Sequence, residues 1–456
     1  RRYSVDLGQK PSAALSMNTD RLAALISIAA AAMLSLGGTF AGGFVVAHKE
    51  LWPYTLLVDA GRAVRSTIST GSPEGNRYAR KFLQAGAQGR WETYRPQEML
   101  PGFYAVLGYD IGPGNHTMRL FSNSGELVST IDVNQALDMT DRAIEYKDPH
   151  GFALLADGSI LVNFDRLPTL ARIDACGEVM WRNEALFHHS IELTDRNTAW
   201  TWRGEPDAYS MAQFMDEVDV ETGTILRSIS MEDVVIAAGS KAAFLNRDPV
   251  PFPTPLPPAV SDGAGDAFHP NDVEELSASM ADAFPSFEAG DLLISLKTTD
   301  VVAVIDPLDA SLKWLSRGPW SKQHDPDFMP DGRISVFDNN SNVIERAKVT
   351  YGPSAIVEID PETNEVRTIL NDGDTTFLTP AQGTHQRLPN GNVLVVVPHE
   401  GRMIEYNAAG EVVAIFNNVD GEEGPRTFHM SNARWVPADY FVDAPSCFAE
   451  KLAAAE

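Results

Sequence analysis

Two short patterns recur along the chain after residue 100, each six times. The first is a hairpin in which an apolar strand ends in a polar turn and a second apolar strand follows, at 118–128, 171–181, 217–226, 302–314, 356–366 and 403–413. The second is a histidine that leads through a short strand and a turn into another strand, at His150, His189, His269, His324, His385 and His429. The two patterns alternate strictly. Because two hairpins make one four-stranded sheet, we predict an all-β domain, a six-bladed β-propeller over residues 101–456.

The order of the units also predicts how the ring closes. The chain enters the repeats with the hairpin at 118–128 and leaves them with a histidine unit at 429–441, in which 437–441 is the weakest copy of the second strand. These two units are therefore expected to share a blade, which joins the ring and hides its strand edges.

The first hundred residues have a different character. Residues 22–47 contain no charged side chain. As a helix rising about 1.5 Å per residue they exceed the roughly 30 Å hydrocarbon core of a bilayer. We therefore predict a transmembrane helix, with a cleaved signal peptide as the competing interpretation, although the apolar region of a signal peptide is shorter. In residues 48–100, apolar and basic residues at helical spacing are followed by a stretch of mixed composition. We predict a juxtamembrane helix and a connector there.

Basic residues flank the span on both sides and favour a cytoplasmic arm at 1–21. This orientation predicts a single-pass protein of a bacterial inner membrane, with the large domain in the periplasm. The two cysteines, Cys176 and Cys447, have no close spacing, which excludes a zinc cluster of cysteines. One long-range disulfide between them stays possible in an oxidising compartment.

The charge balance restricts the partners of the protein. The chain has 36 Lys and Arg against 62 Asp and Glu, a formal net charge of −26. This charge repels phosphate backbones, and the sequence has no basic patch, so no nucleic-acid partner is predicted. An anionic substrate would have to be held by local cations.

The repeat histidines are the candidate chemical groups. If the repeats are related by rotation, their imidazoles converge on the propeller axis, where such a ring can bind a metal or an oxyanion, transfer protons or supply a nucleophilic nitrogen. We predict no metal, because no two histidines have helical i,i+4 spacing and ligands from six blades would surround a wide channel. The runs at 262–266 and 338–342 have incomplete calcium-loop spacing, and turn chemistry accounts for them. A structural alternative holds for each histidine, namely that it ends a strand by bonding to a neighbouring carbonyl.

Several stretches around these histidines resemble the bacterial arylsulfotransferase family. The matching stretches are 187–191 (FHHSI), 269–273 (HPNDV) followed by 291–297 (DLLISLK), 304–306 leading to 313–314, and 323–325 (QHD) running into 334–339. The resemblance extends from about residue 100 to the end. It implies a six-bladed propeller that moves a sulfuryl group from a phenolic sulfate ester to another phenol through a sulfohistidine, with neither a nucleotide sulfate donor nor a cofactor.

The resemblance also implies roles for individual residues. His324, in the Gln-His unit, would be the nucleophile. His269 and His189 would bind and polarise the sulfate, with His188 as a further sulfate-binding candidate. His385, another histidine of the ring, is included among the substrate-binding residues.

One position departs from the family pattern. Where the family has an arginine on the strand after the His-x-Asn unit, this chain has Lys297. Lysine keeps the positive charge but lacks the bidentate fork that suits an oxyanion. Arg317 could replace the missing group, or it could be a solvated loop residue.

A second function from a different class is compatible with the same sequence. The propeller could serve as an interaction subunit of a membrane complex and carry out no catalysis. Three features favour this hypothesis: the Lys297 departure, the glycines of the predicted span (Gly38 and Gly42), which let another helix approach closely, and the proline-rich segment 248–258. That segment is extended and stiff, either as an exposed loop or as a lid or docking arm.

Overall fold

The computed structural model describes residues 78–82, 89–137, 148–164, 167–204, 213–245, 268–342, 349–350, 352–371, 377–419 and 426–455. The chain divides into two compact units, Arg1–Arg77 and Tyr78–Glu456, and the described residues belong to the second. The predicted arm, transmembrane helix, juxtamembrane helix and proline-rich segment lie outside the described residues. No helix in the described part of the chain is both long enough and apolar enough to cross a membrane.

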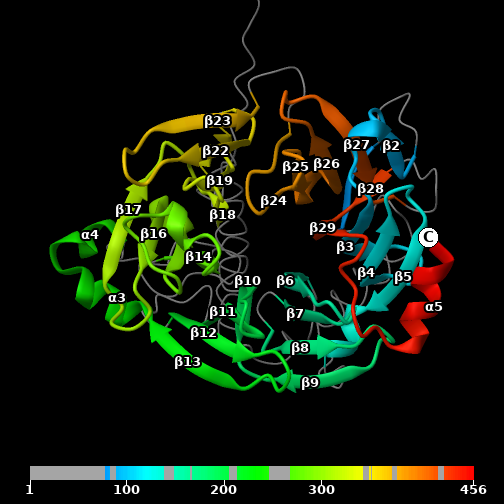
Figure 1. Cartoon of the computed structure of the whole chain (residues 1–456), viewed down its shortest axis with the longest axis horizontal. Coiled ribbons are helices and arrows are strands. Elements are labelled where there is room, and N and C mark those ends of the chain that lie inside the picture. The colour runs from blue at the N-terminus through cyan, green and yellow to red at the C-terminus, as the bar shows by residue number, and fades with distance from the viewer. Residues whose placement is uncertain are drawn as a thin grey trace, which may run out of the picture. The chain divides into compact units, whose positions relative to one another are not determined.

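Six antiparallel sheets surround a common axis in the second unit (Figure 1). We number these blades from the one that contains the first described sheet strands after residue 100. From the axis outward, blade 1 consists of β29 (Met430–Pro437), β3 (Gly102–Asp110), β4 (Asn115–Ser122) and β5 (Leu127–Asp132). Blade 2 consists of β6 (Pro149–Leu154), β7 (Ile160–Phe164), β8 (Leu170–Ile173) and β9 (Val179–Asn183). Blade 3 consists of β10 (Phe187–Leu193), β11 (Thr198–Gly204), β12 (Gln213–Asp219) and β13 (Ile225–Ser230).

The remaining blades follow the same order. Blade 4 consists of β14 (Pro270–Glu275), β15 (Leu292–Leu296), β16 (Val301–Ile305) and β17 (Leu312–Arg317). Blade 5 consists of β18 (His324–Phe328), β19 (Ile334–Asp338), β22 (Ala355–Ile359) and β23 (Val366–Leu370). Blade 6 consists of β24 (Thr384–Arg387), β25 (Val393–Val397), β26 (Arg402–Tyr406) and β27 (Val412–Asn417), with β2 (Trp91–Thr93) as a fifth strand. The predicted six-bladed propeller is confirmed.

Short elements lie between and around the blades. Two small sheets pair β1 (Ala79–Phe82) with β28 (Arg426–Phe428), and β20 (Ser341–Asn342) with β21 (Val349–Thr350). The helices among the described residues are α3 (Met231–Ala238), α4 (Ala242–Leu245) and α5 (Ser446–Ala455). The 3-10 turns are η1 (Pro96–Glu98), η2 (Val133–Ala136), η3 (Gly239–Lys241), η5 (Ala281–Ala283), η6 (Lys297–Thr299) and η7 (Pro398–Glu400). The last part of the predicted connector thus contributes β1, β2 and η1 to the propeller unit.

The hairpin repeat forms the third and fourth strands of each blade, counted from the axis, and its polar turn residue has a structural reason. The side-chain oxygen of this residue accepts a backbone N–H two to four residues further on, which closes the turn. The residues that accept in this way are Ser122, Asp174, Asp219, Asp306, Asp360 and Asn407.

The ring closes in blade 1 through strands from opposite ends of the chain. The inner strand β29 pairs antiparallel with β3 along its whole length, for example Trp435 with Tyr104. The expected sharing of a blade by the first hairpin and the last histidine unit therefore occurs. The second strand of that unit is β3, however, and the expectation for 437–441 was wrong. The backbone of β29 is paired with β3. Residues 438–441 instead form a turn that leads towards α5.

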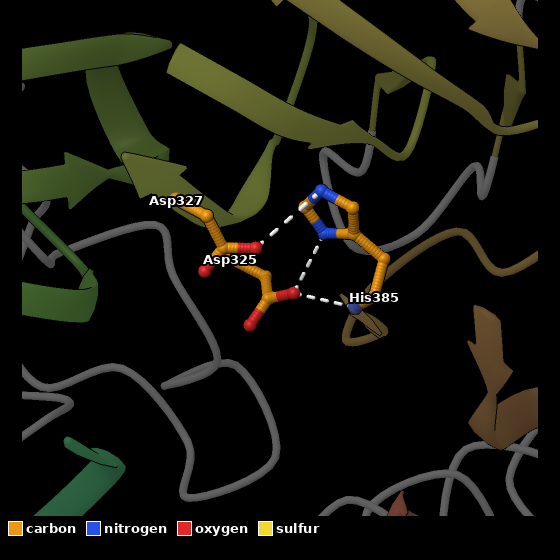
Figure 2. Close-up of side chains that lie close together, drawn as sticks. All are labelled: Asp325, Asp327 and His385. Carbon is orange, nitrogen blue, oxygen red and sulfur yellow. Dashed lines mark hydrogen bonds and ion pairs between the residues drawn. The ribbon is translucent and has the colours of Figure 1, made fainter. Parts of the chain in front are cut away.

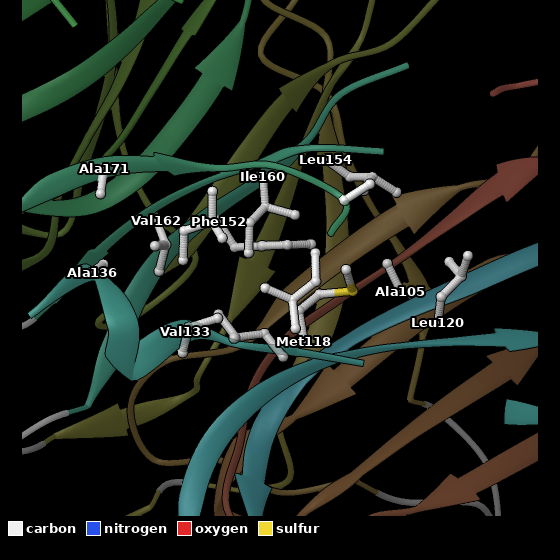
Figure 3. Packing of buried hydrophobic residues seen from close by; sticks show 14 of the residues in the cluster. Ala105, Met118, Leu120, Val133, Ala136, Phe152, Leu154, Ile160, Val162 and Ala171 are labelled. Carbon is white, nitrogen blue, oxygen red and sulfur yellow. The ribbon is translucent and has the colours of Figure 1, made fainter. Parts of the chain in front are cut away.

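Apolar side chains from adjacent blades fill the spaces between the blades. Between blades 1 and 2, for example, Met118 and Leu120 of β4 belong to the same buried cluster as Phe152 of β6 and Val162 of β7 (Figure 3). Because the middle strands contact a neighbouring blade on both faces, they consist of nearly unbroken apolar residues, as in β16 (VVAVI) and β25 (VLVVV).

A disulfide ties the C-terminal helix to blade 2. Cys176, in the turn between β8 and β9, is bonded to Cys447 of α5, with a Cα–Cα distance of 6.0 Å. The neighbouring Phe448 is buried in the cluster between blades 1 and 2. The disulfide that the sequence left open is therefore present, and it covalently links residues 271 positions apart.

Candidate active site

The six repeat histidines lie within or just before the first few residues of the inner strands. In five blades the inner strand changes register against its neighbour at this point: between Pro149 and Phe152, His188 and Ile191, Pro270 and Asp272, His324 and Asp327, and Met430 and Asn432. Such bulges redirect side chains that would otherwise alternate between the two faces of the sheet. The exception is β24, which keeps regular register from Thr384 to Arg387.

Two of the histidines also have an unusual backbone conformation. His189 and His269 have φ values of 59° and 45°, in the left-handed region that residues with a Cβ atom rarely adopt. Hydrogen bonds to their carbonyl oxygens hold this backbone, because Asn163 Nδ2 donates to His189 O at 3.1 Å and Lys297 N donates to His269 O at 3.1 Å. Strained backbone held in this way is common at functional sites.

Four of the repeat histidines come together with Lys297. The ring centroids of His150 and His189 are 4.1 Å apart, and those of His189 and His269 are 5.1 Å apart. Lys297 Nζ lies 3.3 Å from His269 Nε2. His324 shares with His150 and His189 the lining of a cavity of about 50 Å³. The predicted convergence on the axis thus occurs for His150, His189, His269 and His324, which with Lys297 we call the histidine cluster.

The hydrogen bonds of His324 distinguish its two ring nitrogens. Nδ1 lies 2.6 Å from Asn339 Oδ1 and 3.0 Å from the carbonyl oxygen of Lys322. Asn339 Nδ2 donates to the carbonyl oxygens of Thr379 and Gln382, which leaves only Oδ1 to face the imidazole. Because both partners of Nδ1 are acceptors, Nδ1 carries the proton. Nε2 is therefore unprotonated, and its electron pair accepts a hydrogen bond from the Gln382 backbone N–H at 3.2 Å.

The surroundings keep two imidazoles of the cluster, those of His324 and His189, neutral. Burial lowers the pKa of His324 well below its usual value, and the positive charge of Lys297 lowers it further. Burial also lowers the pKa of His189, with a second contribution from His150. A neutral imidazole keeps the electron pair that nucleophilic attack requires.

The other predicted site residues lie around or outside this cluster. His188 is fully buried, with Nε2 3.0 Å from Gln213 Oε1 and Nδ1 2.6 Å from His189 Nδ1, so it positions His189. Arg317 is exposed at the end of the outermost strand β17, where Nε donates to Thr299 O. This places Arg317 away from the axis, and the structure does not bring it to the histidine cluster.

His385 belongs to a different group of side chains, as the regular register of β24 explains. Its Nδ1 lies 2.8 Å from Asp325 Oδ2, and its Nε2 lies 2.5 Å from Ser335 Oγ and 3.5 Å from Asp327 Oδ2 (Figure 2). Burial by itself would lower the pKa of His385, but the charges of Asp327 and Asp325 raise the pKa above its usual value. These three residues are also close enough together to be considered as metal ligands.

Comparison with known proteins identifies the family. A family model described as Arylsulfotransferase (ASST) matches residues 151–418, more than half of the 456-residue chain. The chain belongs to the arylsulfotransferase family. The matched region includes Lys297 and all predicted site histidines. No curated protein matches the chain.

Several solved structures are similar to this arylsulfotransferase-family chain at low identity. A protein of unknown function from Bacteroides caccae has 14% identity and a TM-score of 0.46, over 70% of this chain and 94% of that one. Virginiamycin B lyase from Staphylococcus aureus has 11% identity and a TM-score of 0.34, over 64% and 84% of the two chains. TolB from Acinetobacter baumannii has 12% identity and a TM-score of 0.38, over 74% and 67%.

Sequence reasoning missed two residues that shape the site of this arylsulfotransferase-family propeller. Asn339 fixes the tautomer of His324, and Gln382 contacts His324 through its backbone and His429 Nε2 through Oε1 at 3.4 Å. Asn339 lies in the run at 338–342, which turn chemistry had accounted for. The sequence offered one signal for Asn339, which is that a polar residue ends the second strand after the Gln-His unit.

Four tryptophans that lie near the ends of the repeats have structural positions. Trp200, Trp202 and Trp320 are buried in apolar clusters, and Trp181 packs against another such cluster while its Nε1 donates to Val220 O. They therefore belong to the core.

Proposed function

We propose that the protein is an aryl-sulfate sulfotransferase that transfers a sulfuryl group from a phenolic sulfate ester to a second phenol through a sulfohistidine at His324. The observation that supports this most strongly is the state of His324. Its Nδ1 proton is donated to Asn339, and its Nε2 is unprotonated, so that its electron pair can attack once the Gln382 N–H withdraws. It also shares a cavity with two other histidines.

In the first step, His324 Nε2 attacks the sulfur atom. An N–S bond forms while the bond between sulfur and the phenolic oxygen breaks, and the phenolate leaves and takes a proton from water. Sulfur is neither oxidised nor reduced. In the second step a phenol loses its proton to water and attacks sulfur, and the S–N bond breaks to release neutral His324.

The cations and donors around His324 suit the charge that develops during this transfer. The ammonium group of Lys297 and the N–H groups of His189 and His269 would contact the nonbridging sulfuryl oxygens. The proton on Nδ1 makes the sulfonated imidazole cationic, and Asn339 Oδ1 stabilises that cation through its hydrogen bond. Lys297 would take the place of the arginine that the family pattern has there.

A trapping experiment tests this proposal. Protein mixed with a chromogenic aryl sulfate in the absence of acceptor, and quenched early, should carry one sulfuryl group on the peptide that contains His324. His324→Asn should abolish both the label and turnover, whereas the control His399→Asn, at a histidine of η7, should keep both. A label on another residue, or activity that survives His324→Asn, would contradict the assignment.

We also propose that the propeller is anchored by residues 22–47 and lies in the periplasm. The uncharged length of this segment supports an anchor. The bond between Cys176 and Cys447 supports an oxidising compartment, where disulfides persist.

A further inference from the structure

Lys297 and His324 belong to different blades, although the proposed function requires them to act on the same sulfuryl group. Lys297 begins the η6 turn, which follows β15 of blade 4, and His324 is the first residue of β18 in blade 5. The relative position of the two side chains therefore depends on how the η6 turn is held against the segment before β18. That segment contains Lys322, two residues before His324.

The side chain of Lys322 crosses the boundary between the two blades. Its Nζ donates to the carbonyl oxygens of Lys297 at 3.2 Å and of Thr298 at 3.3 Å, and to Asp300 Oδ1 at 2.9 Å. An ammonium group has three donors, so these three acceptors use all of them. Only 15% of the side-chain surface is exposed. Lys322 therefore holds the η6 turn and has no N–H left to donate to a substrate.

The backbone of Lys322 makes contacts on both sides of the same boundary. Its N–H donates to Asp300 Oδ1 at 2.8 Å, and its carbonyl oxygen accepts from His324 Nδ1 at 3.0 Å. Lys322 and Asp300 have φ values of 58° and 56°, in the left-handed region that residues with a Cβ atom rarely adopt. The hydrogen bonds between the two residues hold this backbone. One residue thus contacts both the turn that carries Lys297 and the imidazole of His324.

The neighbouring Gln323 joins the two blades independently of the η6 turn. Its Nε2 donates to Ser295 Oγ of β15 at 3.1 Å and to Val301 O of β16 at 2.9 Å. Its carbonyl oxygen accepts from Asn271 Nδ2 of β14 at 2.7 Å. Loss of the Lys322 ammonium group should therefore release the η6 turn while blades 4 and 5 stay joined.

We propose that Lys322 is a positioning residue that fixes the ammonium group of Lys297 relative to the imidazole of His324. This role rests on the proposed function, because the sulfuryl transfer gives both groups their tasks. The positive charge of Lys297 lowers the pKa of His324, so a displaced Lys297 should leave that pKa higher. A displaced Lys297 should also stabilise the transferring sulfuryl group less, since reaction rates are sensitive to small displacements of charged groups.

A set of variants of the full-length protein tests this role. Lys322→Met removes three donors and keeps the length of the side chain, so turnover of an aryl sulfate should fall roughly tenfold or more. Lys322→Arg keeps the charge and can donate to the same carbonyl oxygens, so it should restore most of the turnover. The matched control is Lys313→Met on the outermost strand β17 of blade 4. Lys313 is also largely buried and has three carboxylate partners, and its replacement should leave turnover unchanged.

Two measurements separate positioning from general support of the fold. An NMR titration of labelled histidine, with the His324 signal assigned by its absence in His324→Asn, reports the protonation of that imidazole without any need for turnover. His324 should become protonated at a higher pH in Lys322→Met than in the wild type. In a double-mutant cycle, Lys322→Met should add little to the effect of Lys297→Met, because it acts through Lys297. A direct effect of the Lys322 charge would persist in the Lys297→Met background.

The outcomes for positioning and for sulfuryl transfer can be told apart. The positioning role is overturned if Lys322→Met leaves the titration of His324 unchanged, or shifts it equally with and without Lys297. A wild type without turnover, in which Lys322→Met still shifts the titration through Lys297, would contradict the proposed function and support the positioning role. If Lys322→Met does not fold, Lys322→Gln, which keeps an amide donor and loses the charge, takes its place in both measurements.

Discussion

At the scale of single residues, the sequence could predict that repeat histidines come together at the axis but could not predict their hydrogen bonds. The repeat predicted that His324 lies near the axis, because residues at the same position of each repeat occupy equivalent places in successive blades around the axis. The role of Asn339 could not be predicted, since its contact with His324 depends on a bulge at the start of β18 and on the packing of residues 379–382 beside it. Arg317 is close to His324 in the sequence but does not lie at the axis, so sequence proximity alone did not predict its place.

Lys297 allows a prediction at this scale. The charge of Lys297 lowers the pKa of His324, so Lys297→Met should raise that pKa. Because only neutral His324 is nucleophilic, the loss of kcat/KM on the acidic side should then begin at a higher pH than in the wild type. Turnover of an aryl sulfate by Lys297→Met should fall by roughly one to two decades, since a charge-assisted hydrogen bond contributes about 1.5–3 kcal/mol.

The pH profile of kcat/KM for wild type, Lys297→Met and Lys297→Arg measures this effect. Lys297→Arg keeps the charge and adds a bidentate donor, so its profile should match that of the wild type and its turnover should be equal or higher. An unchanged profile in Lys297→Met would show that Lys297 does not act on the reacting imidazole.

At the scale of secondary-structure elements, the hairpins were predictable and the inner strands only partly so. Polar turn residues closed the outer hairpins where the repeat placed them, because an Asx turn is a local interaction. The bulges of five inner strands and the regular register of β24 were not predictable, since the register of a strand pair is decided by packing against neighbouring blades. That difference separates His385 from the histidine cluster.

The disulfide between α5 and blade 2 gives a prediction for an element. Cys447→Ser releases α5 from the β8–β9 turn, and Phe448 should then lose part of its hold on the core between blades 1 and 2. The free energy of unfolding should fall by roughly 2–4 kcal/mol, as measured by urea denaturation. Reductant should destabilise the wild type to the same extent and leave Cys447→Ser unaffected. Equal stability of the two proteins would mean that α5 contributes little to the propeller.

At the scale of the whole molecule, the sequence predicted the ring and its closure because both follow from the count and order of the repeats. It did not predict the pairing of β2 with blade 6, since no repeat contains residues 91–93. Nor did it predict the contacts through which Lys322 joins blades 4 and 5. Those contacts depend on how the two blades lie against each other, and no linear pattern specifies this.

The proposed location leads to the last prediction. If residues 22–47 span the inner membrane with residues 1–21 inside, an epitope tag after Glu456 should be removed by protease added to intact spheroplasts. A tag before Arg1 should be protected until the membrane is dissolved. In the same cells Cys176 and Cys447 should resist a membrane-permeant maleimide, because the periplasm keeps them oxidised. A protected C-terminal tag together with two reactive thiols would place the propeller in the cytoplasm and reverse the proposed orientation.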